Sequence, residues 1–278
     1  MSRMQTREIT LGARTISVTE AGDGAPIVLL HAFPLSARMW HAQLARLPPG
    51  WRAIAPDFRG LGRSPRGEAP ARHVGDHAAD VLGLVDALGL PPAVVAGVSM
   101  GGYVAFEIWR QRPESVRALV LADTRAEADT DEARGKRVAM QERALREGTA
   151  AVIDAMLPGL LGETTQVGDP HLAREVRDWA LESEPAGVAD ALEALKTRPD
   201  SRATLGTITC PTLVVVGEED TLTPPAAARV IADGIAGARY APIARAGHLA
   251  NVEQPEAFDA VLRPWLAALA RAAALPEE

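Results

Sequence analysis

Short apolar runs with little polar alternation recur toward both ends of the chain, and they are rich in Val, Ile, Leu and Ala. Runs of this kind are typical of strands buried on both faces of a sheet. Ahead of them, residues 8–11 and 14–19 flank Gly12, which predicts a hairpin. The pattern predicts a twisted, mostly parallel sheet of about eight strands. The apolar runs lie at residues 26–30, 53–55, 93–96, 116–121, 211–216 and 239–244.

Stretches with helical spacing separate these runs, at residues 76–88, 102–112, 225–235 and 256–273. A strand followed by a helix and another strand needs a crossover, and crossovers join parallel strands. Successive crossovers place helices on both faces of the sheet. The chain is therefore predicted to have an α/β fold.

The alternation stops between residues 124 and 205, where no strand-like run occurs and many charged residues follow helical spacing. This predicts a helical cap, residues 124–205, inserted into a core domain of residues 1–123 and 206–278. An elaborated crossover packed beside the sheet is the alternative. The terminal residues 272–278 are expected to fray. Apolar residues of the cap would form either an apolar substrate site or the cap's own core: Met140, Leu145, Met156, Leu157, Leu160 and Trp179.

Charge and cysteine content exclude several classes of protein. The net charge of the 278 residues is −7 and the 29 Lys and Arg residues are scattered, so no nucleic-acid partner is expected. The single cysteine, Cys210, excludes an internal disulfide framework. The first ten residues lack the apolar core of a signal peptide, and no apolar run could span a bilayer. We therefore expect a cytoplasmic protein without a membrane span; the oligomeric state is left open.

One motif carries a candidate nucleophile. Gly97-Val98-Ser99-Met100-Gly101 follows a predicted strand directly and precedes a predicted helix. A very tight strand-to-helix turn strains its central residue and needs small residues two positions away on each side. The motif therefore predicts that the Ser99 hydroxyl projects into a crevice. A glycine-rich turn with an idle serine is the alternative.

A serine hydroxyl needs a base, and the sequence offers six histidines. Only His31 and His248 follow strand runs, and ligands bind at the carboxyl ends of strands in open α/β sheets. His248 is the predicted base, whereas His31 is predicted to orient its own loop. The others are placed in helices or in the cap: His41, His73, His77 and His171.

Two aspartates end strand runs and could orient the histidine, Asp123 and Asp220. The chain order of nucleophile, acid and histidine fits both. Asp220 is preferred because its loop, residues 217–225, turns sharply after the strand, and Asp123 remains the alternative.

Developing negative charge on a substrate oxygen needs backbone N–H donors. These are predicted to be Met100, directly after the nucleophile, and Phe33, in the loop after an early strand.

Other conspicuous residues are predicted to be structural. The loop Asp57-Phe58-Arg59-Gly60-Leu61-Gly62-Arg63-Ser64 lacks the spacing and the lysine of phosphate-binding loops. Asp76, Asp80 and Asp86 are spread along a helix, and they are predicted to be solvated rather than to bind a metal. Cys210 is expected to be buried and inert. No metal or cofactor site is predicted.

Taken together, these segments resemble the α/β-hydrolase superfamily over nearly the whole chain, and they are most similar to its cap-bearing carboxylesterases and 3-oxoadipate enol-lactonases. The resemblance implies that Ser99 is the nucleophile, with Asp220 and His248 completing the triad. It also implies Phe33 and Met100 as oxyanion donors and no cofactor. The segments that carry it are His31-Ala32-Phe33-Pro34, Asp57-Phe58-Arg59-Gly60 and residues 97–102, 217–225 and 247–255.

Two residues depart from the family pattern. Ala32 stands where the family usually has glycine, and its Cβ is expected to narrow the oxyanion loop or limit its φ. Leu61 replaces a usual histidine and is expected to alter packing only.

The predicted function is that of a serine carboxylic ester hydrolase (EC 3.1.1) acting on small or short-chain esters. A lactonase of the 3-oxoadipate enol-lactonase type, which uses the same machinery on a cyclic ester, is the alternative. Dehalogenases and epoxide hydrolases of this fold use an aspartate nucleophile, so Ser99 argues against both. A small-molecule receptor with an idle triad is the third hypothesis, because fold alone does not fix function.

Overall fold

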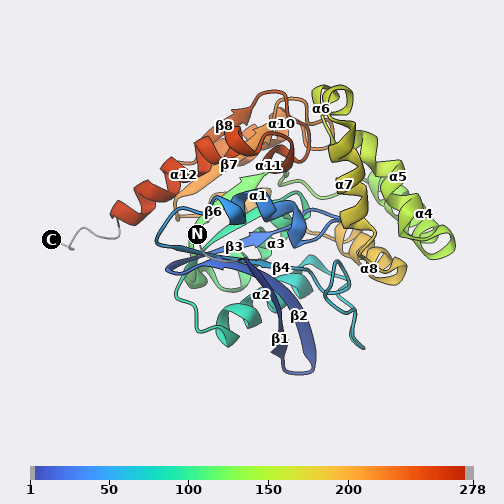
Figure 1. Cartoon of the computed structure of the whole chain (residues 1–278), viewed down its shortest axis with the longest axis horizontal. Helices are drawn as coiled ribbons and strands as arrows, with labels where there is room; N and C mark the ends of the chain where they lie inside the picture. The colour runs from blue at the N-terminus through green and yellow to red at the C-terminus, as the bar shows by residue number, and fades with distance from the viewer. Residues whose placement is uncertain (1–3, 273–278) are drawn as a thin grey trace.

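The computed structural model describes residues 4–272, and Figure 1 shows its central sheet with helices on both sides. Of residues 272–278, which are predicted to fray, Ala272 is the last residue of the helix Pro255–Ala272, and the others lie outside the described residues. The eight strands run in the order β1-β2-β4-β3-β5-β6-β7-β8. β2 pairs antiparallel with β1 and β4, and the remaining neighbours are parallel. The strands are β1 (Gln5–Leu11), β2 (Arg14–Gly22), β3 (Ala25–Leu30), β4 (Trp51–Pro56), β5 (Ala93–Val98), β6 (Val116–Ala122), β7 (Thr212–Gly217) and β8 (Arg239–Ile243).

The mostly parallel sheet predicted from the apolar runs is thus confirmed. Every residue of β5 and of β7 is buried, as the lack of alternation in these runs predicts. Successive residues of a strand point to opposite faces. Ile27 and Leu29 accordingly pack into one core, and Val28 and Leu30 pack into the other.

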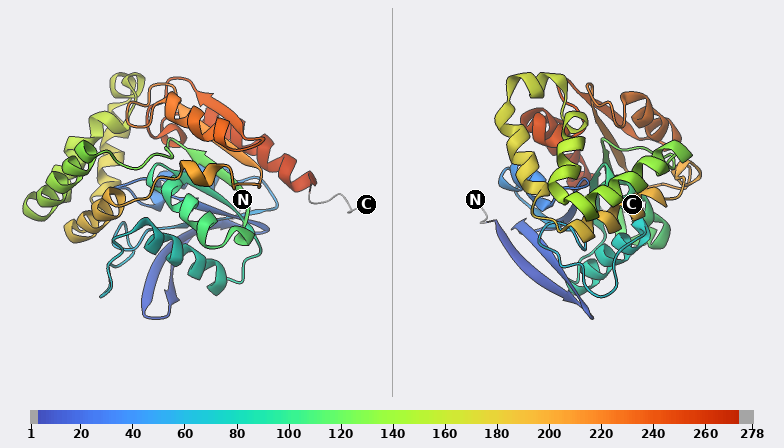
Figure 2. Two further views of the ribbon diagram at one scale, coloured as in Figure 1. Left: turned by 180° about the vertical axis from the view of Figure 1, so that it is seen from behind. Right: turned by 90° about the vertical axis from the view of Figure 1, so that its right-hand side faces the viewer.

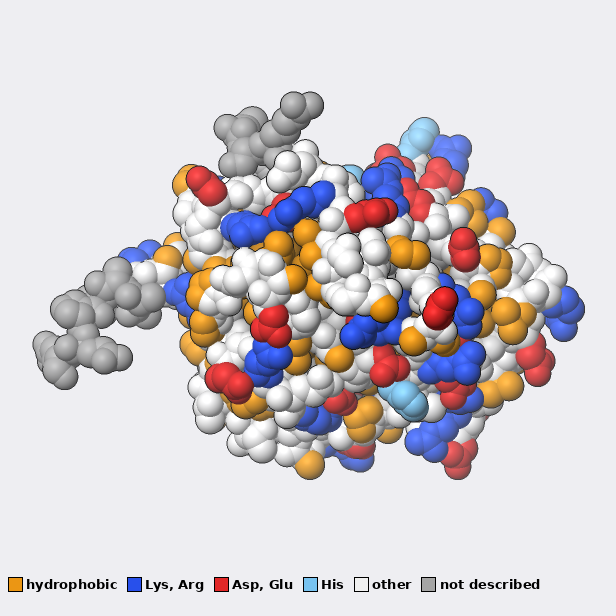
Figure 3. Space-filling model, turned by 90° about the horizontal axis from the view of Figure 1, so that it is seen from below, with side chains coloured by type: hydrophobic (Ala, Val, Ile, Leu, Met, Phe, Trp, Pro, Cys, Tyr) orange, Lys and Arg blue, Asp and Glu red, His pale blue; other side chains and the backbone are white. Residues whose placement is uncertain are grey.

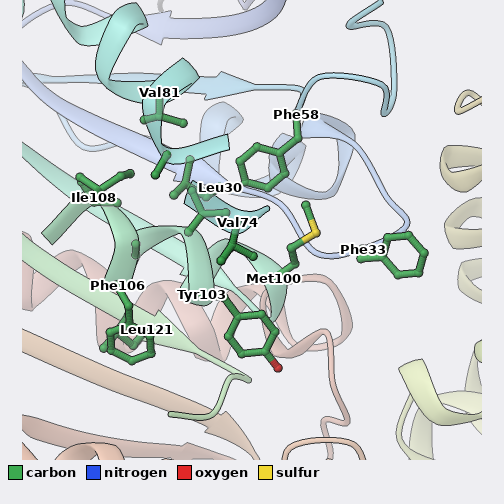
Figure 4. Close-up of a cluster of buried hydrophobic side chains, with 14 of the residues drawn as sticks. Leu30, Phe33, Phe58, Val74, Val81, Met100, Tyr103, Phe106, Ile108 and Leu121 are labelled. Atoms are coloured by element: carbon green, nitrogen blue, oxygen red, sulfur yellow. The ribbon is translucent and has the colours of Figure 1, made fainter. Parts of the chain in front are cut away.

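Two helical layers cover the faces of the sheet. One consists of α2 (Val74–Ala87), α3 (Met100–Gln111) and α10 (Pro225–Gly234). Figure 4 shows the core beneath α2 and α3, where Leu30, Val74, Val81 and Phe106 lie close together. The opposite face is covered by η1 (Ala37–Trp40), α1 (His41–Ala45) and α12 (Pro255–Ala272), with α11 (Ala250–Glu253) leading into α12.

Six helices lie between β6 and β7, and no strand interrupts them in this described segment. Figures 1 and 2 show α4, α5, α7 and α8 grouped at one end of the sheet. α4 packs against α5 and α8, and α5 packs against α7, whereas the short α9 packs against α10 of the sheet layers. The six are α4 (Asp131–Glu147), α5 (Thr149–Leu160), α6 (Glu163–Gly168), α7 (Pro170–Ala180), α8 (Pro185–Lys196) and α9 (Arg202–Leu205).

A glycine contact joins α8 to the sheet domain. A Cβ built on Gly187 would lie 1.8 Å from the carbonyl oxygen of Gly60, so only glycine allows the two backbones to approach this closely. Arg66 and Arg72, which follow Gly60, both form ion pairs with Asp190 of α8. These contacts hold α8 against the loop that follows β4.

Replacing Gly187 by alanine is expected to lower the free energy of unfolding by about 1–3 kcal/mol, because one backbone must move to admit the methyl group. The measurement is urea denaturation followed by circular dichroism. Gly135→Ala in α4 is the matched control, because a Cβ there meets nothing within 4 Å. The control should be stabilising by roughly 0.5–1 kcal/mol through helix propensity. Equal effects at both positions would contradict the close contact at Gly187.

The sequence prediction that Asp80 of α2 is solvated is wrong. Asp80 is only 4% exposed, and its carboxylate pairs with Arg59 at 2.8 Å and with Arg14 at 2.6 Å. It is buried rather than solvated because the loop after β4 places the Arg59 side chain over α2. Asp86 is exposed and pairs with Arg112, and Asp76 caps the start of α2.

Neither the surface charges nor the single cysteine indicates a further functional site. On the face shown in Figure 3, Lys and Arg side chains are interspersed with Asp and Glu. Cys210 is half-buried rather than buried, and burial raises the pKa of its thiol to about 11, which fits the predicted inertness. Among the described residues, no helix is long and apolar enough to cross a bilayer.

Candidate active site

Ser99 lies in the turn between β5 and α3, with φ 54° and ψ −113°. Positive φ is strained for a residue with a side chain, so the surroundings must enforce it. A Cβ on Gly97 would lie 2.2 Å from the Gly101 carbonyl oxygen, and a Cβ on Gly101 would lie 2.3 Å from that of Leu30. The two glycines therefore permit the tight turn that the sequence motif predicts.

The structure brings Ser99, His248 and Asp220 into one hydrogen-bonded chain. His248 Nε2 lies 2.8 Å from Ser99 Oγ, and His248 Nδ1 lies 2.9 Å from Asp220 Oδ2. A carboxylate only accepts hydrogen bonds, which assigns the proton to Nδ1 and leaves Nε2 free to accept the serine proton. His248 and Asp220 are each 3% exposed, and Ser99 is half-buried. The geometry matches that of a nucleophile, its base and an orienting acid.

The loop after β7 holds Asp220 in its ionised form. Burial raises the pKa of this carboxyl, but the positive charge that His248 carries when protonated and the hydrogen bonds from His248 and Thr223 outweigh burial, so the pKa lies below its ordinary value. Oδ1 accepts the backbone N–H groups of Leu222 and Thr223 at 2.8 and 2.9 Å, and Oδ2 accepts the Thr223 hydroxyl at 2.6 Å. The sharp turn that favoured Asp220 in the sequence supplies these donors.

Asp123, the alternative acid, makes no hydrogen bond to His248 in the described structure. Its backbone has φ 44°, and its oxygens accept the N–H groups of Gly217 at 2.8 Å and Ala250 at 3.1 Å. It is fully buried, and burial together with the nearby Asp220 raises its pKa well above the ordinary value. Asp123 thus links β6 to the loops that carry Asp220 and His248.

The N–H groups of Phe33 and Met100 have no protein acceptor within residues 4–272. Met100 opens α3, where backbone N–H groups lack helical partners. The Phe33 loop is held by His31, whose Nδ1 donates to the Ala32 carbonyl at 2.9 Å and whose Nε2 accepts the Phe58 N–H at 2.9 Å. Burial lowers the pKa of His31 to about 4, so it is neutral and orients the loop, as predicted.

The two residues that depart from the family pattern are both buried. Ala32 does not have a positive φ, so its backbone conformation does not require the freedom of glycine. Leu61 is fully buried in the core cluster that also contains Phe58 and Val74, where it contributes packing.

Glu253 is a buried carboxylate that the sequence reasoning did not single out. It accepts the N–H groups of Gly247 at 2.8 Å and Leu249 at 3.2 Å, on either side of the candidate base. It also accepts the N–H of Gly162 at 2.7 Å and the hydroxyl of Thr165 at 2.6 Å, at the start of α6. The position of Glu253, five residues after His248, was the one feature of the sequence that could have indicated a role near the candidate base. Glu253 joins the histidine loop to the helical insertion.

A cavity of about 470 Å³ opens from Ser99 and His248 toward the helices between β6 and β7. Of the apolar residues proposed for the substrate site, Met140 and Met156 line this cavity, whereas Leu160 is fully buried and Leu145 is 65% exposed. The remaining apolar lining comes from Phe33, Tyr103, Ala133, Ala155, Leu195 and Leu222, and the charged lining from Arg125, Asp129, Lys136, Arg137 and Arg198.

Comparison with known proteins agrees with this architecture. A family model described as the alpha/beta hydrolase fold matches residues 25–255. A thermophilic esterase from Thermogutta terrifontis, solved with malate bound, is 37% identical and has a TM-score of 0.90. The match covers 95% of this chain and 99% of that esterase.

Two further relatives are named as an enol-lactonase and as a methyl ester esterase. The enol-lactonase from Burkholderia xenovorans LB400 is 27% identical, with a TM-score of 0.86 over 94% of this chain and all of that one. The pimeloyl-(acyl-carrier protein) methyl ester esterase of Neisseria meningitidis is 30% identical, over 86% of this chain and 92% of the relative.

Proposed function

Because the chain belongs to the α/β-hydrolase family, we propose that it cleaves small carboxylic esters through an acyl-enzyme on Ser99, as a carboxylesterase of class EC 3.1.1. The observation that carries the proposal is the hydrogen-bonded chain from Ser99 Oγ through His248 to Asp220, with distances of 2.8 and 2.9 Å. The esterases among its relatives support it.

Each residue has a step in the proposed mechanism. His248 Nε2 accepts the hydroxyl proton as Ser99 Oγ attacks the ester carbonyl. The N–H groups of Phe33 and Met100 stabilise the negative oxygen of the tetrahedral intermediate. His248 then protonates the leaving alcohol, and a water activated by the same imidazole releases the acid. Asp220 holds the imidazole in the required tautomer throughout and stabilises its charged form.

Lactone hydrolysis is the second candidate, favoured by the likeness to an enol-lactonase. Ring opening needs the same nucleophile, base and oxyanion donors, because a lactone is an internal ester. A receptor with an idle triad is disfavoured by the oriented hydrogen bonds and by two backbone donors left without protein acceptors.

Covalent labelling tests the proposal. Treatment with an organophosphate or a sulfonyl fluoride should abolish hydrolysis of para-nitrophenyl acetate, and peptide mass spectrometry should place one adduct on Ser99. The remaining hydroxyl groups serve as internal controls, because none of them is hydrogen-bonded to His248 Nε2 in the described structure. A label elsewhere, or activity that survives complete labelling, would overturn the assignment. A panel of esters and enol-lactones compared by kcat/KM distinguishes esterase from lactonase.

We further propose that residues 124–205 act as a cap that shapes substrate preference, while the core of residues 1–123 and 206–278 supplies the chemistry. Met156→Ala should shift the preferred acyl length and change kcat/KM for the longer esters by about tenfold, because Met156 lines the cavity. Hydrolysis of para-nitrophenyl acetate, which needs few cap contacts, should change much less. Val138→Ala is the control, since Val138 lies on α4, is 40% exposed and does not line this cavity. Equal loss on all substrates would mean that the cap positions the triad.

A further inference from the structure

The cavity next to Ser99 carries positive charge although the chain as a whole is acidic. Four basic residues line it, Arg125, Lys136, Arg137 and Arg198, against one carboxylate, that of Asp129. The chain carries a net charge of −7, so this excess is local to the cavity. A cavity lined by one sign of charge attracts ligands of the opposite sign.

Asp129 offsets only part of this charge. Its Oδ1 pairs with Arg198 at 2.7 Å and its Oδ2 pairs with Arg137 Nε at 3.2 Å, so one carboxylate is shared by two guanidinium groups. Arg198 is buried and also donates to two backbone carbonyls, which makes it part of the fold. Arg137 uses only Nε in the described structure, and its two terminal nitrogens have no protein acceptor there.

Arg125 adds a second cation to the same wall. Its guanidinium donates to the carbonyl oxygen of Leu222, and no carboxylate among residues 4–272 forms an ion pair with it. Lys136 is less well placed to bind a ligand, because its side chain is 74% exposed and its ammonium group contacts Glu132. Arg198 has only its buried Nε without a partner, because both of its terminal nitrogens are used. Arg125 and Arg137 are therefore the two cavity arginines with terminal N–H donors that have no protein acceptor in the described structure.

We propose that the substrate is an ester with a second, ionised carboxylate remote from the scissile bond, and that Arg125 and Arg137 bind this carboxylate. Guanidinium groups match carboxylates with paired hydrogen bonds, and these are stronger in a partly enclosed cavity than at the surface. The apolar side chains of Met140, Met156 and Leu222 also line the cavity and suit a methylene chain between the two ends. The inference rests on the proposed ester hydrolysis at Ser99.

Matched pairs of esters test the substrate class. Monoethyl adipate and ethyl 6-methylheptanoate differ only in a terminal carboxylate against an isopropyl group of the same shape. On the alcohol side, 6-acetoxyhexanoate and 6-methylheptyl acetate form the corresponding pair. At low salt, kcat/KM for the carboxylate member of one pair should exceed that of its neutral partner by about tenfold or more, and the ratio should fall as salt screens the charges. The pair that shows the preference identifies the side of the ester that carries the carboxylate.

Arginine variants test the binding residues. Arg125→Gln and Arg137→Gln should each reduce the ratio of carboxylate to neutral ester by about tenfold, mainly through KM for the carboxylate ester. Arg134→Gln is the matched control. Arg134 lies on α4, as Arg137 does, but it pairs with Asp131 and does not line the cavity. Its ratio should equal that of the wild type. In Arg137→Gln, Asp129 keeps its ion pair with Arg198, so the fold is expected to survive.

The outcomes separate this inference from the proposed function. Hydrolysis of the neutral esters without any preference for a carboxylate would overturn the inference and leave the ester hydrolase intact. A preference that persists in both arginine variants would overturn the assignment of Arg125 and Arg137. Absence of Ser99-dependent hydrolysis of every ester, including para-nitrophenyl acetate, would overturn both proposals.

Discussion

Ser99→Ala should reduce kcat for para-nitrophenyl acetate by about 10⁴-fold or more, since no other hydroxyl in the described structure is hydrogen-bonded to His248 Nε2. The proposed oxyanion donors, the N–H groups of Phe33 and Met100, belong to the backbone and remain in place, so some rate above that of water should persist. The measurement is steady-state hydrolysis with freshly purified enzyme, checked for contaminating esterase by titration with an organophosphate.

Comparing Ser99→Ala with Ser99→Gly separates chemistry from folding. The backbone at this position has φ 54°, which costs a residue with a Cβ roughly 1–2 kcal/mol but costs glycine much less. Both variants should show the same large loss of kcat, and Ser99→Gly should unfold at a temperature no lower than Ser99→Ala. Activity near that of the wild type in either variant, with native circular dichroism, would contradict the proposed nucleophile.

The fold could be predicted from the sequence because burial of the strands on both faces directly causes the apolar runs. β5 and β7 are buried on both faces, and a strand in that position has no solvent side on which polar residues could alternate. The turn at Ser99 could also be predicted from the sequence, because the close approach of Gly97 to the Gly101 carbonyl is local, although Gly101 itself lies against Leu30 of β3. In both cases the sequence pattern that reveals the constraint lies within one short segment of the chain.

The features that sequence missed depend on contacts between distant segments. Asp80 looks like a solvated helix residue, and it is buried because Arg59, 21 residues away, folds over it. Met156 and Leu160 are one helical turn apart, yet only Met156 lines the cavity. Helical spacing marks both as apolar and does not say which one faces a substrate.

The choice between the two candidate acids also depended on three-dimensional contacts. Asp123 and Asp220 both follow strands at the same edge of the sheet, and chain order fits either. The backbone of Asp123 has φ 44°, and its carboxylate accepts hydrogen bonds from the backbone N–H groups of Gly217 and Ala250. Asp220 instead lies 2.9 Å from His248 Nδ1. The direction of a side chain in a turn is set by backbone angles that composition and spacing do not encode.

Asp220→Asn should therefore lower kcat by roughly 10³- to 10⁴-fold while the protein stays folded. The amide can keep its oxygen on the N–H groups of Leu222 and Thr223, which turns its NH₂ group toward His248 Nδ1. That group donates, so the histidine proton moves to Nε2, where it blocks acceptance of the serine proton. Two-dimensional NMR of the imidazole nitrogens would detect the change of tautomer directly.

Asp123→Asn is the informative comparison. Both carboxylate oxygens of Asp123 accept a backbone N–H group, whereas the amide of asparagine has only one oxygen that can accept. A donor facing a buried N–H costs about 1–3 kcal/mol, so this variant should unfold at a lower temperature. Its histidine should keep the proton on Nδ1, because Asp220 is unchanged, and its kcat should fall much less than that of Asp220→Asn. A folded Asp123→Asn with the larger loss of kcat, or an Asp220→Asn with wild-type activity, would assign the orienting role to the acid after β6 instead.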